Sequence, residues 1–112
     1  MSVNRILGQQ FNNGLSCHVT EFGGIGNADI AKAVIQGRYP AHGFALNHAS
    51  DMLLYVLSGS GSLVLHDEEY QLHPTNVIQV DKETPYYYEG NGLEILIMCS
   101  PAWNADQYEQ ID

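Results

Sequence analysis

Short runs of alternating hydrophobic and polar residues follow one another along the whole chain. Each run is rich in β-branched, leucine and aromatic residues and ends near Gly, Pro or Asn, which is the pattern of β-strands joined by turns. Because such runs recur about every ten residues, we predict an all-β sandwich or barrel. The expected strands are residues 15–22, 29–37, 52–59, 61–67, 69–73, 76–80, 85–90 and 93–99.

Polar and glycine-rich segments between these runs predict the turns. Ser58-Gly59-Ser60-Gly61 has the glycines that a tight hairpin turn needs, and Asp67-Glu68-Glu69 predicts a second reversal. The segment Glu89–Gly92 predicts a corner between the last two strands. Residues 104–109 predict one or two helical turns with Asn104 as the N-cap.

Composition narrows the protein class. The chain has 112 residues and 45% hydrophobic residues, which suits one globular domain over residues 1–112. Its net charge of −9 argues against nucleic acid and anionic membranes as partners. No run is apolar enough to span a membrane or to act as a signal peptide. Together with two distant cysteines, Cys17 and Cys99, expected as buried thiols, this predicts a cytoplasmic protein.

Four segments resemble the motifs of the small single-domain cupins. They are Leu54–Gly61, His73–Val80, Thr84–Tyr88 and Cys99–Trp103, within a similarity that covers about residues 29–103. The resemblance implies a cupin double-stranded β-helix, a jelly-roll barrel that pairs as a homodimer.

The metal ligands of that family are missing here. Metal-binding cupins carry two His, a Glu and a later His, and those roles correspond to Ala45, Asn47, Asp51 and Tyr86. None of the four is a histidine, and imidazole nitrogens are the strong donors of such sites. The chain therefore resembles a subset of small cupins without the metal-binding histidines, and we expect no metal and no cofactor.

Alternation along the strands suggests what has replaced the ligands. The family's ligand positions point into the barrel, so Asn47, Asp51, Tyr55, Tyr86 and Tyr88 are expected to form an inward-facing cup. Such a cup suits a small polar or aromatic molecule. Asp51 is the candidate base and Tyr86 the candidate proton donor of an isomerase or lyase.

Other residues leave alternatives open. Arg38 and His48 are further candidate ligand-binding residues, with Arg38 suited to an anion or to a surface ion pair. The same cup could serve a non-catalytic binding or sensing module. A displaced metal site of His42, His48 and Asp51 would instead make a metal-dependent enzyme with unusual ligands. Trp103 is expected to pack over the end of the barrel.

Overall fold

The computed structural model describes residues 1–112, and β-strands make up most of the chain, which confirms the all-β prediction. No helix is long and apolar enough to cross a membrane. The strands are β1 (Gln9–Asn13), β2 (Cys17–Ile25), β3 (Ala28–Tyr39), β4 (Phe44–Asn47), β5 (Asp51–Val64), β6 (Glu69–Leu72), β7 (Val77–Val80), β8 (Tyr87–Ser100) and β9 (Tyr108–Ile111), with one 3-10 turn, η1 (Ala105–Gln107).

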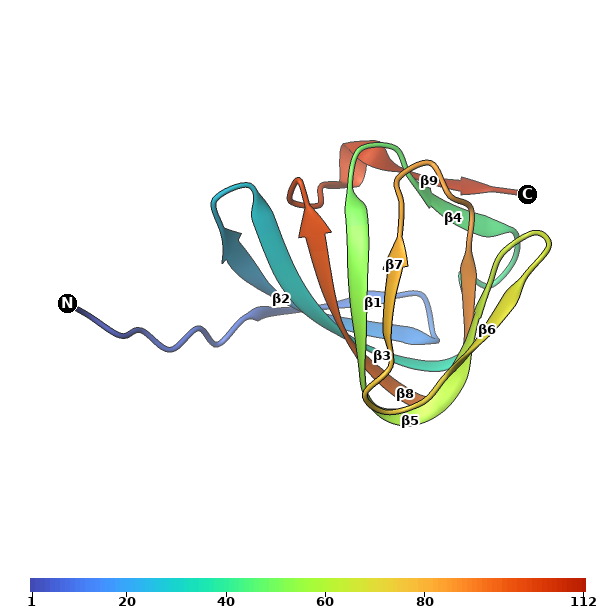
Figure 1. Cartoon of the computed structure of the whole chain (residues 1–112), viewed down its shortest axis with the longest axis horizontal. Helices are drawn as coiled ribbons and strands as arrows, with labels where there is room; N and C mark the ends of the chain where they lie inside the picture. Colours follow the sequence, from blue (N-terminus) through green and yellow to red (C-terminus); the bar gives the residue numbers. More distant parts are fainter.

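One antiparallel sheet wraps around to form the barrel. Its strand order is β1-β2-β3-β8-β5-β6, and β7 pairs with the first half of β5. A small second sheet of β4 and β9 lies at one end of the barrel, where a bridge between Ala45 and Tyr86 connects it to the start of β8. Figure 1 shows the long strands β5 and β8 curving around the opposite end.

The two longest strands differ from the prediction. Residues 58–61 and 89–92 were expected to be turns, but they lie inside the continuous strands β5 and β8. Both strands bend there with shifts of register, because two backbones cross closely. A side chain at Gly59, which has a φ of +77°, would place its Cβ 2.0 Å from the carbonyl oxygen of Gly92. Glycine at this position therefore permits a bend within the continuous strand β5, rather than a hairpin turn.

The apolar core fills only part of the barrel. Large side chains that are fully buried gather from β5, β6 and β8, and they include Leu54, Leu63, Leu72, Leu93 and Ile95. The inward face of β3 carries the small Ala31 and Ala33, followed by one large residue, Ile35. Large residues on one side and small ones on the other leave a space inside the barrel.

Several elements lie outside the predicted set. Strands β1, β4 and β9 were not predicted, because they are only four or five residues long and carry little alternation. The helical turn near residue 105 exists as η1, but the Asn104 side chain makes no capping hydrogen bond. Cys17 and Cys99 are both buried and free, as expected.

Candidate functional site

A cavity of about 710 Å³ opens inside the barrel beside the small residues of β3. Its walls come from β1, β2, β3 and β8, from Asn47 of β4 and Met52 of β5, and from Ala102, Trp103, Asn104 and Tyr108. Ala31 and Ala33 line the cavity, so it is wider here than it would be with leucine or valine at these two positions. This volume is that of a site for a small organic molecule.

Aromatic rings cover much of the cavity wall. The rings of Tyr86 and Tyr88 pack edge to face with centroids 5.3 Å apart, and those of Trp103 and Tyr108 do so at 6.2 Å. The hydroxyls of Tyr39 and Tyr108 are 3.2 Å apart and share a hydrogen bond. Edge-to-face aromatic walls suit the flat part of a ligand.

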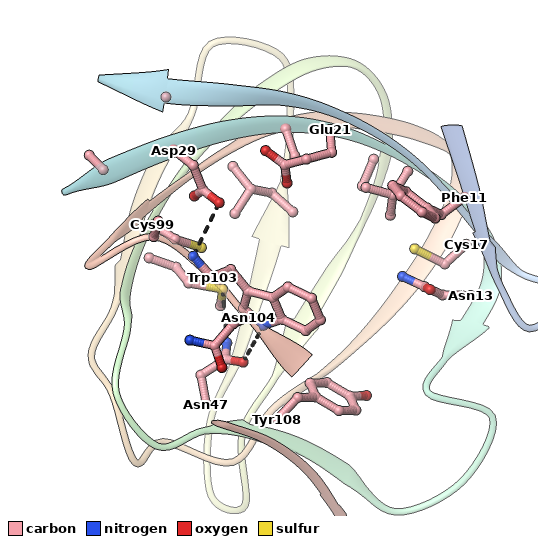
Figure 2. Close-up of a pocket in the computed structure, with 18 of the residues that line it drawn as sticks. Phe11, Asn13, Cys17, Glu21, Asp29, Asn47, Cys99, Trp103, Asn104 and Tyr108 are labelled. Carbon is pink, nitrogen blue, oxygen red and sulfur yellow. Dashed lines mark hydrogen bonds between the residues drawn. The ribbon is translucent and has the colours of Figure 1, made fainter. Parts of the chain in front are cut away.

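Two hydrogen bonds fix Trp103 in the cavity wall, and both are visible in Figure 2. Its indole Nε1 donates to Oδ1 of Asn47 over 3.0 Å, and its backbone N–H donates to Oδ2 of Asp29 over 3.1 Å. The buried amide of Asn47 in turn donates to the sulfur of Met52 at 3.3 Å. The Trp103 ring is therefore held in place, although 41% of the residue is exposed.

The hydroxyl of Tyr88 has no hydrogen-bond partner in the barrel interior. Tyr88 is only 3% exposed and lines the cavity. Burial raises the pKa of Tyr88 well above its ordinary value, so the hydroxyl keeps its proton. An unpaired buried hydroxyl costs stability, and a molecule in the cavity would supply the acceptor that it lacks.

Two carboxylates enter the cavity from neighbouring strands. In the β2–β3 ladder Glu21 lies opposite Ala31, and Asp29 is two residues from Ala31 on the same face. Figure 2 shows both carboxylates on the same side of the cavity. Burial raises the pKa of Glu21, the nearby Asp29 raises it further, and the N–H of Gly23, which donates to Oε1 over 3.0 Å, partly offsets this.

A β-bulge shapes the strand that carries Glu21. The β2–β3 register shifts between Glu21 and Gly23, and such bulges redirect side chains next to binding sites. Gly24 must be glycine, because a Cβ there would come within 1.7 Å of the Ala28 carbonyl oxygen. The glycines of this hairpin thus allow the close approach of β2 and β3 that places Glu21 and Asp29 on the same side of the cavity.

The segment that closes the cavity is fastened by a buried glutamine. Oε1 of Gln107 accepts the backbone N–H groups of Ala49 and Ser50 at 2.9 and 2.7 Å. Its Nε2 donates to Oγ of Ser50 over 2.7 Å. These three bonds tie η1 to the loop before β5 and so position Trp103 and Tyr108.

Three of the expected site residues line the cavity, and two lie elsewhere. Asn47, Tyr86 and Tyr88 are cavity residues. The expected inward orientation of Asp51 and Tyr55 is wrong, since both lie on the exposed face of β5. Asp51 Oδ1 accepts the backbone N–H of Lys82 over 2.8 Å, which is a loop-fixing role.

The inward residue at this place is Met52. Its sulfur receives the Asn47 amide and, at 3.8 Å, the Tyr86 hydroxyl. Strand faces alternate with a period of two, so a one-residue difference in phase exchanges the inner and outer sets. The short loop at Ser50 sets that phase, and the residue pattern did not reveal it.

Arg38 and His48 also lie outside the cavity. The Arg38 guanidinium donates to the carbonyl oxygens of Ala41 and Gly43 at 3.0 and 2.8 Å, and it stacks 3.9 Å from the ring centre of Tyr87. It thus holds the loop before β4. His48 bridges Glu83 at 3.1 Å and Glu109 at 2.8 Å on the surface.

The residues of the hypothesised metal site do not converge. His42 contacts Asp112 at 2.9 Å, whereas His48 and Asp51 have the separate partners described above. No group of three or more His, Cys, Asp or Glu side chains is arranged to hold a metal ion. The geometry therefore does not fit a metal centre of His42, His48 and Asp51.

Sequence reasoning missed Glu21, Asp29, Tyr39 and Tyr108 as cavity residues. Glu21 and Asp29 flank the glycine-rich segment between the expected strands 15–22 and 29–37, for which no role was predicted. A signal did exist, because both are acidic residues at the facing ends of two expected strands. The thiols of Cys17 and Cys99 also line the cavity. Burial raises their pKa values to about 11 and about 12, so neither is a thiolate nucleophile near neutral pH.

Comparisons with known proteins give the fold. No protein-family model and no curated protein matches the chain. A variant of Pac13 from Streptomyces solved with uridine is 21% identical, with a TM-score of 0.85 over 99% of this chain and 92% of that one. Pac13 is described as a nucleoside dehydratase.

Two further solved structures are similar over the same barrel. Ectoine synthase from P. lautus is 10% identical with a TM-score of 0.73, over 100% of this chain and 91% of that one. An RmlC-like cupin from Shewanella frigidimarina is 14% identical with a TM-score of 0.72, over 89% and 88%. The fold that the resemblance implied is confirmed.

Proposed function

We propose that this protein, which has the cupin fold, binds a small molecule with a flat ring in its barrel cavity and moves a proton on it as a lyase or isomerase. The observation that carries the proposal is the cavity of about 710 Å³ that holds both a carboxylate pair and an unpaired tyrosine hydroxyl. Pac13, a nucleoside dehydratase, and ectoine synthase have the same fold, which supports this reaction class.

Glu21 is the residue that we assign as general base. A carboxylate that takes a proton from carbon near neutral pH works best with a raised pKa, and the pKa of Glu21 is raised by burial and by Asp29. Asp29 accepts the Trp103 N–H, and Glu21 accepts the Gly23 N–H. Each carboxylate accepts one of these backbone N–H groups, so it is the raised pKa that favours Glu21 as the base.

Tyr88 supplies the complementary group. In a β-hydroxy carbonyl compound, transfer of the α-proton to Glu21 places negative charge on the carbonyl oxygen. The carbon–oxygen bond to the β-hydroxyl then breaks, and Glu21 returns the proton to this hydroxyl, which leaves as water. A protonated hydroxyl without a competing partner can donate to that oxygen. Tyr88 has this property, and the Trp103 and Tyr86 rings provide the walls against which a ring would stack.

The test follows proton exchange directly. The protein is incubated in D₂O with a panel of nucleosides and β-hydroxy carbonyl compounds, and proton NMR records deuterium incorporation at the α-carbon or loss of water. For a compound that reacts, Glu21→Gln should lower the rate by roughly a factor of 100 or more, which is the usual contribution of a general base. Its binding affinity for the same compound should change little.

Glu69→Gln is the matched control, because Glu69 is an exposed carboxylate of β6 outside the cavity. It should leave the exchange rate unchanged. A Glu21→Gln protein with the full rate would remove Glu21 from the mechanism. Compounds that bind in the cavity and never exchange would favour the alternative of a binding or sensing module.

We also propose the cytoplasm as the site of action and a homodimer as the working form. The two free, buried cysteines support a reducing compartment. An outward row of Leu53, Tyr55, Val77 and Met98 across β5, β7 and β8 supports pairing through the barrel strands. Light scattering during size-exclusion chromatography would give the oligomeric state.

A further inference from the structure

We propose that the ligand of the cavity carries a positive charge, a protonated amine or amidine, which pairs with the carboxylates of Glu21 and Asp29. The inference rests on the proposed function in using the same cavity and the same Glu21 carboxylate. It names the charge of the ligand, which that proposal left open.

The first support is the charge of the cavity itself. Glu21 and Asp29 are its only charged side chains, and no Lys, Arg or His is among the residues that line it. The carboxylates therefore have no positive partner within the site, and the whole chain has a net charge of −9. Such a field attracts cations and repels phosphates and carboxylates.

The second support is the unused hydrogen-bonding capacity. Asp29 uses Oδ2 for the Trp103 N–H, and Glu21 uses Oε1 for the Gly23 N–H. Neither carboxylate accepts a hydrogen bond from another side chain, so both keep oxygen lone pairs that can accept the hydrogens of an ammonium group. The pKa of Glu21 is raised partly because Asp29 lies unneutralised beside it, and a bound cation would relieve that repulsion.

The third support is independent of the carboxylates. The Tyr88 hydroxyl lies in the same cavity, in a residue that is 97% buried, and it lacks any partner. It marks a second polar contact point for the same molecule. The Trp103 ring lines the same cavity, with its indole nitrogen held by Asn47, and offers a face for a cation or a flat ring.

The test compares three probes that share a 2-phenylethyl group and differ in the charge of the group attached to it. They are 2-phenylethylamine as the cation, 2-phenylethanol as the neutral compound and 3-phenylpropionate as the anion. Affinities are measured by calorimetry, and the chain's one tryptophan, Trp103, gives an indole NMR signal that reports occupancy of the cavity. The amine should bind about tenfold or more tightly than the alcohol, and the anion should bind most weakly.

Asp29→Asn should bring the amine and the alcohol to within about threefold of each other, since it removes one charge without changing the size of the side chain. Asp67→Asn is the control with the same change of net charge, because Asp67 lies in the exposed β5–β6 turn. It should keep the preference for the amine.

Three outcomes would overturn the inference. They are equal binding of amine and alcohol, failure of the amine to perturb the Trp103 signal at millimolar concentration, and equal effects of Asp29→Asn and Asp67→Asn. The proposed function is tested separately. A charge preference with no effect of Glu21→Gln on exchange contradicts only the proposed function, whereas loss of exchange without a charge preference contradicts only this inference.

Discussion

Replacing Tyr88 with phenylalanine should make the free protein more stable and its ligand binding weaker. The hydroxyl is buried without a partner, and such a group costs about 1–3 kcal/mol of unfolding free energy. Tyr88→Phe removes that cost and keeps the ring that packs against Tyr86 at 5.3 Å. The unfolding free energy should therefore rise by about 1–3 kcal/mol, a shift of roughly 4 °C or more in melting temperature for a chain of this size.

The assay is urea unfolding followed by far-UV circular dichroism, with calorimetry for the melting temperature. Tyr39→Phe is the matched control, because its hydroxyl shares a hydrogen bond with Tyr108 at 3.2 Å. That variant should lose about 0.5–1.5 kcal/mol, the usual net value of a hydrogen bond. The two substitutions remove the same atom and should shift stability in opposite directions.

A stability loss in Tyr88→Phe as large as that in Tyr39→Phe would refute the reasoning, since it would mean that the Tyr88 hydroxyl is satisfied in the free protein. The binding half of the prediction uses 2-phenylethanol, which has a hydroxyl but no charge. Its affinity should fall in Tyr88→Phe, because the donor provided for the ligand is gone.

Three other substitutions test the scaffold around the cavity. Gln107→Ala should cost about 2–5 kcal/mol of unfolding free energy, because two backbone N–H groups, including that of Ser50, lose their acceptor. Gly59→Ala should cost about 2–5 kcal/mol, because a Cβ would meet the Gly92 carbonyl oxygen at a φ of +77°. His48 has a pKa raised by its hydrogen bonds to two glutamates, so its stabilising contribution should be complete below about pH 6.5 and disappear as the pH rises through that raised pKa. Denaturant titrations at pH 5.5 and 8.5 would measure the difference between wild type and His48→Gln.

Each of these has a matched control. Gln71→Ala removes an exposed amide of β6 and should be nearly neutral. Gly14→Ala changes a glycine that also has a positive φ but has no atom within 4 Å of its Cβ, so it should cost only the backbone strain. His73→Gln is the control measured in parallel, since the His73 side chain makes no ion pair. A stability gap for His48→Gln that widens with rising pH would contradict the assigned ion pairs.

The strands could be predicted because the alternation of hydrophobic and polar residues in a strand is visible within a short stretch of sequence. The alternation of residues 29–37 and the resemblance around Leu54–Gly61 depend only on neighbouring residues. The course of the chain through Gly59 and Gly92 could not be predicted in this way, because a pair of glycines is equally compatible with a hairpin turn and with a close strand crossing. Only the partner strand decides between them, and that contact is distant in sequence.

The site was predictable only where the motif placed it. Asn47, Tyr86 and Tyr88 occupy positions that the family motif directs inward, and they line the cavity. Asp51 also occupies a motif position but faces outward, because the loop at Ser50 determines which alternate residues of β5 point into the barrel. Glu21 was not predicted as a site residue for another reason. Strand β2 forms part of the cavity wall only because it pairs with β3, and this pairing is not visible in the sequence.

Alanines 31 and 33 give the protein a way to change its specificity. They carry no polar group and no structural hydrogen bond of the side chain, and yet they determine how much room lies beside Glu21 and Asp29. Exchange of either for valine or leucine would alter the size of the accepted molecule and leave the charged and aromatic groups untouched. A barrel of this design can adapt to new small molecules, in evolution or in the laboratory, without rebuilding its chemistry.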